Sequence, residues 1–481
     1  VDDRAPPRKA SMGLVVAMFV ILGLLFGGGA GWFAWRKFVL PKRPELLVEK
    51  AGAGDLTALA TLGLSHLRGE WGAELDFVKG RAMVERAANG GDPLGLLALG
   101  LLRSNGLPAP DSRENLREAA EVLWREAMEK GAVAAAAERN DPRWIALAVD
   151  AENELMGAVS EQSIQLLEKA VDADYPSAAM VMASLAHTGE EKAKWLTAAE
   201  RFARKAVSKN SVNAVRILGA LHLAGELPDS DRRFGREQLE KAADAGDPLA
   251  ALELANHLLE EGSGREAVAF AEAAWEAGLV PAAAILGEIH FDGKGVDRDP
   301  SRGVKLAAEA AEVGYVRGLA VVARAHSTGE GAELDPRKAE RIWRDLIESG
   351  FTNFNADLGI HLAADGRTSE AIDPLRVAAG SGNAEAAMKL GTILADAATG
   401  EDAFAEAVSW LEKAARANIA GASVALAETI DHPKRERRDP SRAVELLKEL
   451  SDEGDHRSAV RLARFYLEGR GVTRDPTKAM L

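Results

Sequence analysis

The 481-residue sequence contains no cysteine. This excludes disulfides, thiolate nucleophiles and cysteine-based zinc sites, and it leaves the redox compartment undecided. The sequence also lacks the HExxH, GxSxG and Walker motifs. The Gly-x-Gly pairs at 293–295 and 329–331 have neither the preceding strand nor the further glycine of a phosphate-binding loop. We therefore predict no catalytic residues and no cofactor, and we expect a protein that is not an enzyme and has no small-molecule substrate.

An excess of basic residues is missing too. The formal net charge is -15, and residues 1–43 hold seven Lys/Arg against two Asp, so the rest of the chain carries -20. A domain this acidic is a poor nucleic-acid binder, because neutralising phosphates needs surplus Lys and Arg. No nucleic-acid partner is predicted.

A calcium loop is excluded at the acidic segment that begins Asp297-x-Asp299. Loop position six, which requires glycine, is Arg302, and position twelve is Ala308 instead of Glu. We interpret the segment as the N-cap of a helix, and no metal site is predicted.

One long apolar run is present. Residues 12–35 carry no charge, and 24 residues of helix extend about 36 Å, enough for a hydrocarbon core of ~30 Å. Trp32 and Trp35 stand at one end with Arg36 and Lys37 beyond, as interfacial anchors do. A buried core helix and a cleaved signal peptide are disfavoured by this length. We predict a flank at 1–11, a transmembrane helix at 12–35 that contacts the lipid bilayer, and a linker at 36–43.

The orientation of this helix is not decided by charge, because three basic residues precede it and four follow it. The pattern resembles bacterial signal anchors, which implies a single-pass inner-membrane protein with a periplasmic repeat domain; a cytoplasmic domain is the alternative. Small residues spaced four apart would let a second helix pack closely on this one. These predicted helix-packing residues are Gly13, Ala17, Gly23, Gly27 and Gly31.

Beyond residue 43 the chain repeats. Segments such as KAADAGDPLA (241–250) recur, and we call the residue equivalent to Gly246 the junction position. The junctions fall at 54, 91, 131, 174, 210, 246, 278, 314, 350, 382, 418 and 454. From 174 onward the intervals are 36 residues, apart from two of 32. A fixed period of this size indicates a stacked array of small units.

Small residues recur inside each unit. Gly or Ala follows an apolar residue nine positions after eleven of twelve junctions, and Ala stands four positions before nine of them. Close packing of two helices needs small residues at fixed positions. Each unit is therefore predicted to be two antiparallel helices, A after the junction and B before the next, with Gly or Asn as a left-handed cap between units. The predicted fold class is all-α: an α-solenoid of about eleven to twelve helix-pair repeats over 44–481, preceded by one transmembrane helix.

The loop between helices A and B repeats as well, as in FDGKGVDRDPSRG (291–303) and LEGRGVTRDPTKA (467–479). Glycine allows positive φ, Asp caps the next helix, and Pro follows at its first position. Residues 132–173 depart from the period: the junction is either 131 or, after a nine-residue insertion, Asn140. The last residues stop one turn into a helix B, so we expect the natural chain to continue.

These loops and helix residues resemble the Sel1-like repeats, helical relatives of tetratricopeptide repeats. Residues 286–314 and 462–479 follow the family pattern closely, and a looser pattern covers about 44–481. Trp343 and Trp410 stand near the aromatic position of helix B in the family. The resemblance implies right-handed superhelices that hold protein complexes together, often in bacterial envelopes and membrane-associated degradation machinery.

Seven of nine histidines lie near the end of a helix A, four of them at the family's Tyr position. Equivalent atoms on successive repeats lie ~8–10 Å apart, too far to share a metal ion. We interpret these histidines as half-buried rings that bond the A–B loop.

Helix A is expected to line the concave face of the solenoid, with junction positions +3, +7 and +10 on one stripe. Arg457, Arg461 and Arg464 make this stripe basic in the last unit. The other predicted partner-binding residues on this stripe, in earlier units, are Arg317, Arg324, Glu253, Asn256 and Glu288.

The leading hypothesis is a membrane-anchored, non-enzymatic scaffold for proteins of a bacterial envelope complex, whose partners are membrane or envelope subunits. The alternative is an accessory structural subunit of a large membrane complex, held through its transmembrane helix. An envelope enzyme or glycan-binding protein is a third and less favoured class.

Overall fold

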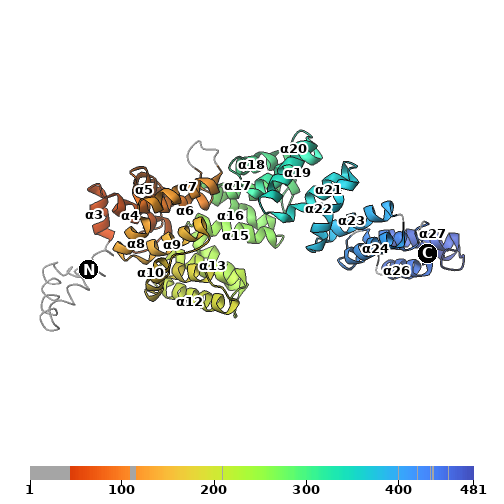
Figure 1. The fold of residues 1–481 in the computed structure, drawn as a ribbon, viewed down its shortest axis with the longest axis horizontal. Helices are drawn as coiled ribbons and strands as arrows, with labels where there is room; N and C mark the ends of the chain where they lie inside the picture. The colour runs from red at the N-terminus through yellow and green to blue at the C-terminus, as the bar shows by residue number, and fades with distance from the viewer. Residues whose placement is uncertain are drawn as a thin grey trace, which may run out of the picture. The chain divides into compact units, whose positions relative to one another are not determined.

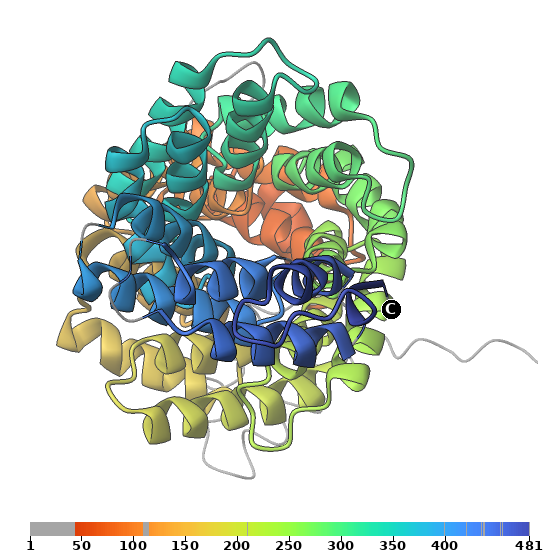
Figure 2. The ribbon, with the colours of Figure 1, turned by 90° about the vertical axis from the view of Figure 1, so that its right-hand side faces the viewer.

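The computed structural model describes residues 44–108, 115–208, 210–398, 400–419, 421–433, 435, 438–452, 454 and 456–480. Within these ranges the chain forms 25 α-helices, α3 to α27, and no strand (Figure 2). The predicted flank, transmembrane helix and linker at 1–43 lie outside the described residues. Among the helices of the described ranges, none combines the length and apolar character that crossing a bilayer requires.

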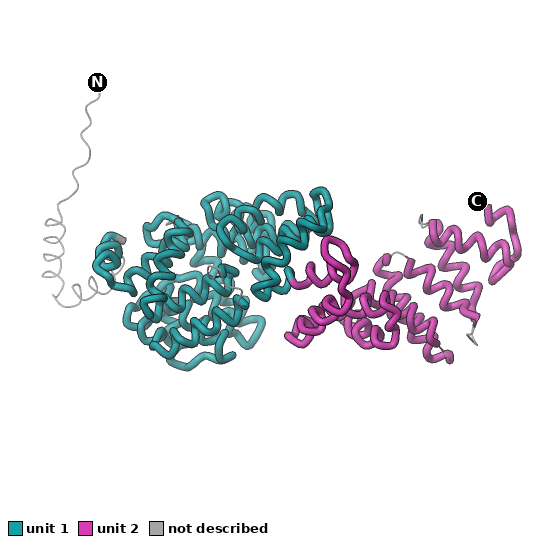
Figure 3. Tube along the Cα trace, turned by 90° about the horizontal axis from the view of Figure 1, so that it is seen from above, with its two compact units in different colours: residues 1–318 teal, residues 319–481 magenta. Residues whose placement is uncertain are grey.

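The chain is organised as two compact units, residues 1–318 and residues 319–481, coloured separately in Figure 3. In unit 1 the helices at A positions are α4 (Leu56–Arg68), α6 (Pro93–Ser104), α9 (Pro142–Met156), α11 (Pro176–Ser184), α13 (Val212–Ala224), α15 (Pro248–Glu260) and α17 (Val280–Asp292). The helices at B positions are α3 (Pro44–Gly52), α5 (Phe77–Asn89), α7 (Leu116–Glu129), α10 (Glu161–Asp172), α12 (Gly189–Val207), α14 (Arg232–Asp244), α16 (Gly264–Glu276) and α18 (Pro300–Glu312).

Helix α19 (Val316–Thr328) begins at the end of unit 1 and continues into unit 2. Unit 2 continues with the A helices α21 (Asn355–Ala364), α23 (Ala384–Ala397), α25 (Ala422–Ile430) and α27 (His456–Glu468). Its B helices are α20 (Pro336–Glu348), α22 (Thr368–Gly380), α24 (Glu401–Arg416) and α26 (Pro440–Asp452), and short 3-10 turns lie at Thr352–Phe354 and Lys478–Met480. The all-helical part of the predicted solenoid is thus confirmed.

Every junction position has the left-handed backbone that the repeat pattern predicts. The φ angle is positive at all twelve, from 56° at Asp174 and Asn418 to 97° at Gly454. Only glycine adopts this conformation without steric cost, and Asn and Asp tolerate it best among the others. The chain can therefore reverse between helix B and the next helix A within two or three residues.

The small residues nine positions after the junction are contact points between helices A and B. A Cβ atom added at Gly287 in α17 would lie 2.8 Å from the Ala307 backbone nitrogen and 2.9 Å from the Gly303 oxygen, both in α18. Since nonbonded atoms do not approach so closely, glycine sets the spacing of this helix pair.

The Asp-Pro pairs begin helices as expected. The Asp299 carboxylate accepts a hydrogen bond from the Arg302 backbone N–H at 3.0 Å, and Asp335 accepts from Lys338 at 3.0 Å. Each Asp also donates its own backbone N–H to the end of the preceding helix A, Asp299 to the His290 oxygen at 2.8 Å. The A–B loop is therefore fixed at both ends.

The irregular segment contains an additional helix. Helix α8 (Ala132–Arg139) follows Gly131, the first of the two candidate junctions, and the second candidate, Asn140 with a left-handed φ of 51°, precedes α9. Helix α9 carries the A-type core of this unit, including Trp144. Of the two open alternatives, the structure thus shows the junction at 140 with α8 as the insertion.

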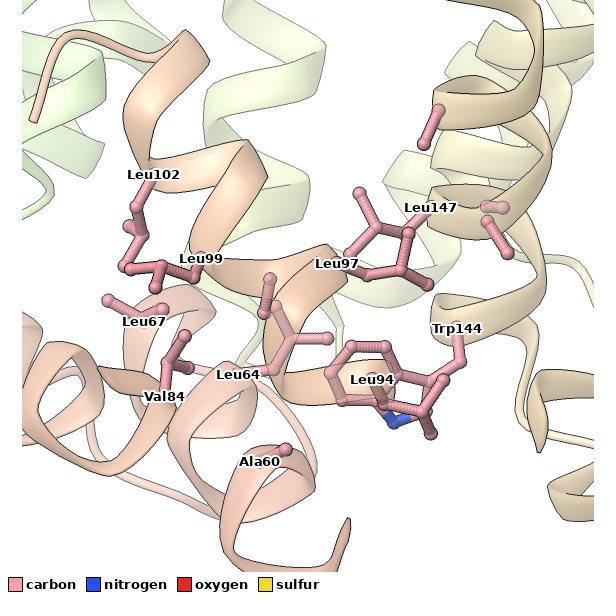
Figure 4. Packing of buried hydrophobic residues seen from close by; sticks show 14 of the residues in the cluster. Ala60, Leu64, Leu67, Val84, Leu94, Leu97, Leu99, Leu102, Trp144 and Leu147 are labelled. Carbon is pink, nitrogen blue, oxygen red and sulfur yellow. The ribbon is translucent and has the colours of Figure 1, made fainter. Parts of the chain in front are cut away.

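Unit 1 has a core that joins repeats far apart in sequence. Leu64, Leu94, Leu97 and Trp144 pack together from α4, α6 and α9 (Figure 4), and the same buried cluster reaches Ala282 in α17. Two backbone hydrogen bonds support this contact: Val280 N–H donates to the Gly106 oxygen at 2.9 Å, and Leu116 N–H donates to the Val313 oxygen at 3.1 Å. The end of α6 accordingly meets the start of α17, and the start of α7 meets the turn after α18 (Figure 1). In unit 2 the buried clusters join successive helices instead, as with Leu375, Leu390 and Ala414.

Candidate interaction surface

Charged side chains on the A helices pair between neighbouring repeats. The Arg317 guanidinium in α19 donates to Glu288 in α17 at 2.6 Å, and Arg216 in α13 donates to Glu253 in α15 at 2.7 Å. Arg461 in α27 pairs in the same way with Glu428 in α25. Ion pairs that include residues of the predicted stripe thus join adjacent A helices at these three places.

These pairs remain partly open to solvent. The side chains of Arg317 and Glu288 keep 27% and 17% of their surface, and those of Arg461 and Glu428 keep 33% and 44%. Burial would raise the pKa of Glu288, but hydrogen bonds from Lys294 and Arg317 outweigh it and lower the pKa. Half-exposed pairs of this kind add little stability. Their side chains are therefore accessible to a partner and already carry complementary charges.

The three arginines of the last unit lie on α27 as predicted, but they are not a row of unengaged cations. Arg461 pairs with Glu428, and Arg464, 61% exposed, lies 3.8 Å from Glu468. Arg457 is exposed. The side chain of Arg324 in α19 is close enough to α21 to lower the pKa of Asp357, although burial is the larger effect and raises it.

The remaining predicted residues belong to unit 1. Asn256 is half-buried on α15, one turn from Glu253. Glu253 and Asp247 share one partner, Arg216, at 2.7 Å and 3.5 Å. Burial raises the pKa of both carboxyl groups despite the attraction of Arg216. Asp247 is buried, so of the two carboxylates only Glu253, which keeps 35% of its side-chain surface, reaches solvent. Whether these residues bind a partner stays a prediction.

A buried polar network in unit 1 was not predicted. Arg143 in α9 is fully buried, donates to Asp141 at 2.9 Å and to the Ser65 hydroxyl at 2.7 Å, and stacks on the Trp71 ring at 3.7 Å. When the junction is set at Asn140, Arg143 stands three residues after it. Arg317 and Arg457 stand three residues after their own junctions. The repeat register was therefore the signal that could have found it.

The loop after α4 extends this network across repeats. Glu70 is buried, and its carboxylate accepts a hydrogen bond from the Asn213 side chain in α13 at 2.8 Å. Arg68 donates to the Tyr175 hydroxyl at 2.6 Å. Burial raises the pKa of Tyr175 to about 12, against the attraction of Arg68. No sequence period marks Glu70, because it lies in a loop and meets a residue 143 positions away.

Three of the histidines at the ends of the A helices, His66, His326 and His222, bond the A–B loops. His66 Nδ1 lies 2.9 Å from the Glu74 oxygen, and His326 Nδ1 lies 2.8 Å from the Glu333 oxygen. His222 Nδ1 accepts the Asp231 backbone N–H at 3.1 Å. Among the residues with described placement, no group of three or more His, Asp or Glu side chains is arranged to hold a metal ion.

The repeated helix pairs, the left-handed junctions and the Asp-capped loops define a helical-repeat protein. Comparison with protein families gives the kind of repeat: the family described as Sel1 repeat matches seven stretches, so Sel1 repeats are present in this chain. The matched stretches are residues 57–92, 213–247, 280–315, 317–344, 384–419, 433–455 and 456–481. No curated protein matches the chain.

Solved structures of repeat proteins resemble the chain at low sequence identity. A protective antigen of uropathogenic Escherichia coli with an SLR fold is 21% identical, with a TM-score of 0.41, and the match covers 91% of this chain and 85% of that one. A Sel1 repeat protein from Oxalobacter formigenes is 21% identical, with a TM-score of 0.36 and coverage of 68% and 98%. Yeast Tom70 is 14% identical, with a TM-score of 0.35 and coverage of 82% and 91%.

Proposed function

We propose that this protein is a non-enzymatic scaffold that binds other proteins through the exposed parts of its A helices. Sel1 repeats generally mediate protein–protein interactions, and seven are present. The observation that carries the proposal is the series of half-exposed ion pairs joining successive A helices, such as Arg317 with Glu288. Complementary charges across an interface favour specific partners and faster association.

The location of the scaffold is the second part of the proposal. Residues 12–35 are uncharged over a length that crosses a bilayer, so they anchor the chain in a membrane. The anchor resembles bacterial signal anchors, which places the repeats in the periplasm and the partners among the proteins of a bacterial envelope complex. The cytoplasmic orientation is the alternative, because the basic residues flanking residues 12–35 do not decide the side.

The test is affinity purification of the full chain in mild detergent, with bound proteins identified by mass spectrometry. Changing Arg457, Arg461 and Arg464 to Glu should release partners held by the A helices. A matched control changes three exposed basic residues of B helices to Glu: Arg341, Arg416 and Lys448. Equal capture by both variants would remove the stripe on α27 from the proposal.

An accessory structural subunit held through its anchor is the competing function. The four-residue spacing of Gly23, Gly27 and Gly31 favours it, since small residues allow close helix contact in a membrane. Changing these three glycines to Leu should then release the chain from its complex, while the α27 arginine variant stays bound. Retention of the leucine variant would contradict this alternative.

A further inference from the structure

Unit 1 contains a pocket of about 280 Å³ outside the A-helix ion pairs. It lies where the start of α7 meets the turn after α18. Its apolar lining residues include Trp124 and Leu116 of α7, Pro281 of α17 and Tyr315. The Trp124 indole N–H already donates to the Leu97 oxygen at 3.3 Å, so the indole adds no free donor to the pocket.

The charge at this pocket is negative. Glu121, Glu154 and Arg117 also line it. Arg117 lies 3.3 Å from Glu121 and is the one cation among the described residues that line the pocket. Glu154 is exposed and forms no ion pair with any described residue.

The pKa of a carboxyl group near the pocket, that of Asp150, is raised in part by the same negative charge. Asp150 lies one helical turn before Glu154 on α9. Its pKa is raised to about 6 by burial and then by the charge of Glu154, against the attraction of Arg68. A cation arriving at Glu154 would be attracted by both carboxyl groups.

We propose that this pocket receives an arginine side chain of a protein partner. A guanidinium stacks on aromatic rings and pairs with carboxylates, which are the two kinds of group that the pocket offers. The volume is below the ~300–1,000 Å³ of ordinary small-molecule sites, and it suits one anchoring side chain. The net charge of -15 attracts a basic partner over longer range. This inference rests on the proposed binding of proteins, and it names the chemistry of one contact.

The experiment uses the three tyrosines of the chain. The full chain is labelled with 3-fluorotyrosine, and the Tyr315 fluorine resonance is assigned by Tyr315→Phe, or by elimination with Tyr175→Phe and Tyr466→Phe. The probes are nine-residue Gly-Ser peptides with a single central arginine, or with its neutral isostere citrulline. At millimolar concentration and low salt, the arginine peptide should shift the Tyr315 resonance and the citrulline peptide should not. Equal shifts, or no shift at Tyr315 with either peptide, would overturn the inference.

A charge variant gives a second readout. Glu154→Gln should weaken binding of the arginine peptide by about threefold, which is the effect of losing one exposed ion pair. Glu138→Gln removes the same charge from another exposed position of unit 1 that does not line the pocket, and it should leave binding unchanged. Unchanged binding in Glu154→Gln would contradict the assignment. Neither readout depends on capturing a natural partner, so failure here is distinct from failure of the scaffold proposal.

Discussion

At the scale of single residues, burial determines how much stability is lost when one partner of an ion pair is removed, and Arg143 and Arg317 differ in this respect. Arg143 keeps 0% of its side-chain surface and Asp141 keeps 8%, whereas Arg317 and Glu288 keep 27% and 17%. Removing one partner of a buried pair leaves an uncompensated charge in a poorly solvated site. Removing one partner of the half-exposed pair costs little stability, because water can solvate the charge that remains.

We therefore expect Arg143→Met to lower the free energy of unfolding of unit 1 by about 3–5 kcal/mol. The matched variant Arg317→Met should cost less than ~1 kcal/mol. Urea unfolding followed by hydrogen exchange of unit 1 amides measures both. Similar losses in the two variants would show that burial does not distinguish these pairs.

Asp150 gives a prediction about pH. Its pKa rises from 3.8 to about 6 in the folded chain, mainly through burial. Between those two values the folded state holds a proton that the unfolded state has lost, so this group lowers stability as pH rises. Below pH 3.8 both states are protonated, and above 6 the loss is constant.

Asp150→Asn removes this titration and keeps the shape of the protonated side chain. The stability of the variant relative to wild type should therefore increase from pH 4 to pH 7, measured by thermal unfolding in buffers of equal ionic strength. Parallel pH profiles for the two proteins would contradict the assigned shift.

At the scale of the element, the helix pair depends on which small residue stands at the contact. Gly287 in α17 meets the backbone of α18, whereas Gly189 at the start of α12 has no atom within 4 Å of the position of an added Cβ. Gly287 is an interior residue of its helix and Gly189 is the first residue of α12, so the gain in helix propensity from Ala should be at least as large at Gly287. Only Gly287→Ala forces two helices apart.

Gly287→Ala is expected to destabilise unit 1 by about 1–3 kcal/mol. Gly189→Ala should be neutral or stabilise it by up to ~1 kcal/mol. Chemical denaturation of the two variants gives the comparison, and an equally stable Gly287→Ala would mean that the pair tolerates a wider spacing.

At the scale of the whole molecule, unit 1 differs from a linear array. In a simple solenoid each repeat contacts only its neighbours and unfolding can begin anywhere. In unit 1 the end of α6 bonds the start of α17, through Val280 N–H and the Gly106 oxygen. Repeats separated by more than 170 positions should therefore open together.

Gly106→Ala tests this coupling. An added Cβ would lie 2.2 Å from Pro281 Cδ, so α6 and α17 would separate. Exchange of the Val280 amide should become at least about tenfold faster, which corresponds to ~1.4 kcal/mol. The control Gly225→Ala carries the same left-handed backbone, with φ 71° and no atom within 4 Å, and it should leave Val280 unchanged. Slow exchange at Val280 in both variants would contradict the coupling.

The sequence by itself determined the helix pairs of this protein. Junction glycines, the Asp-Pro caps and the small residues of the contact act within one repeat, where the period is readable, and Gly246, Asp299 and Gly287 all lie as the period predicts. The sequence did not decide between the junctions 131 and 140. The inserted helix α8 breaks the period, and both positions still carry residues that are typical of a junction.

Tertiary structure alone decided which repeats meet across unit 1 and which charges are engaged. Glu70 meets Asn213, 143 positions away, because each repeat is rotated slightly against the one before it. Such rotations add up over several units, and no single repeat encodes their sum. The arginines of α27 form a basic stripe in the sequence, and only the structure shows that Arg461 is already paired with Glu428 of the neighbouring A helix.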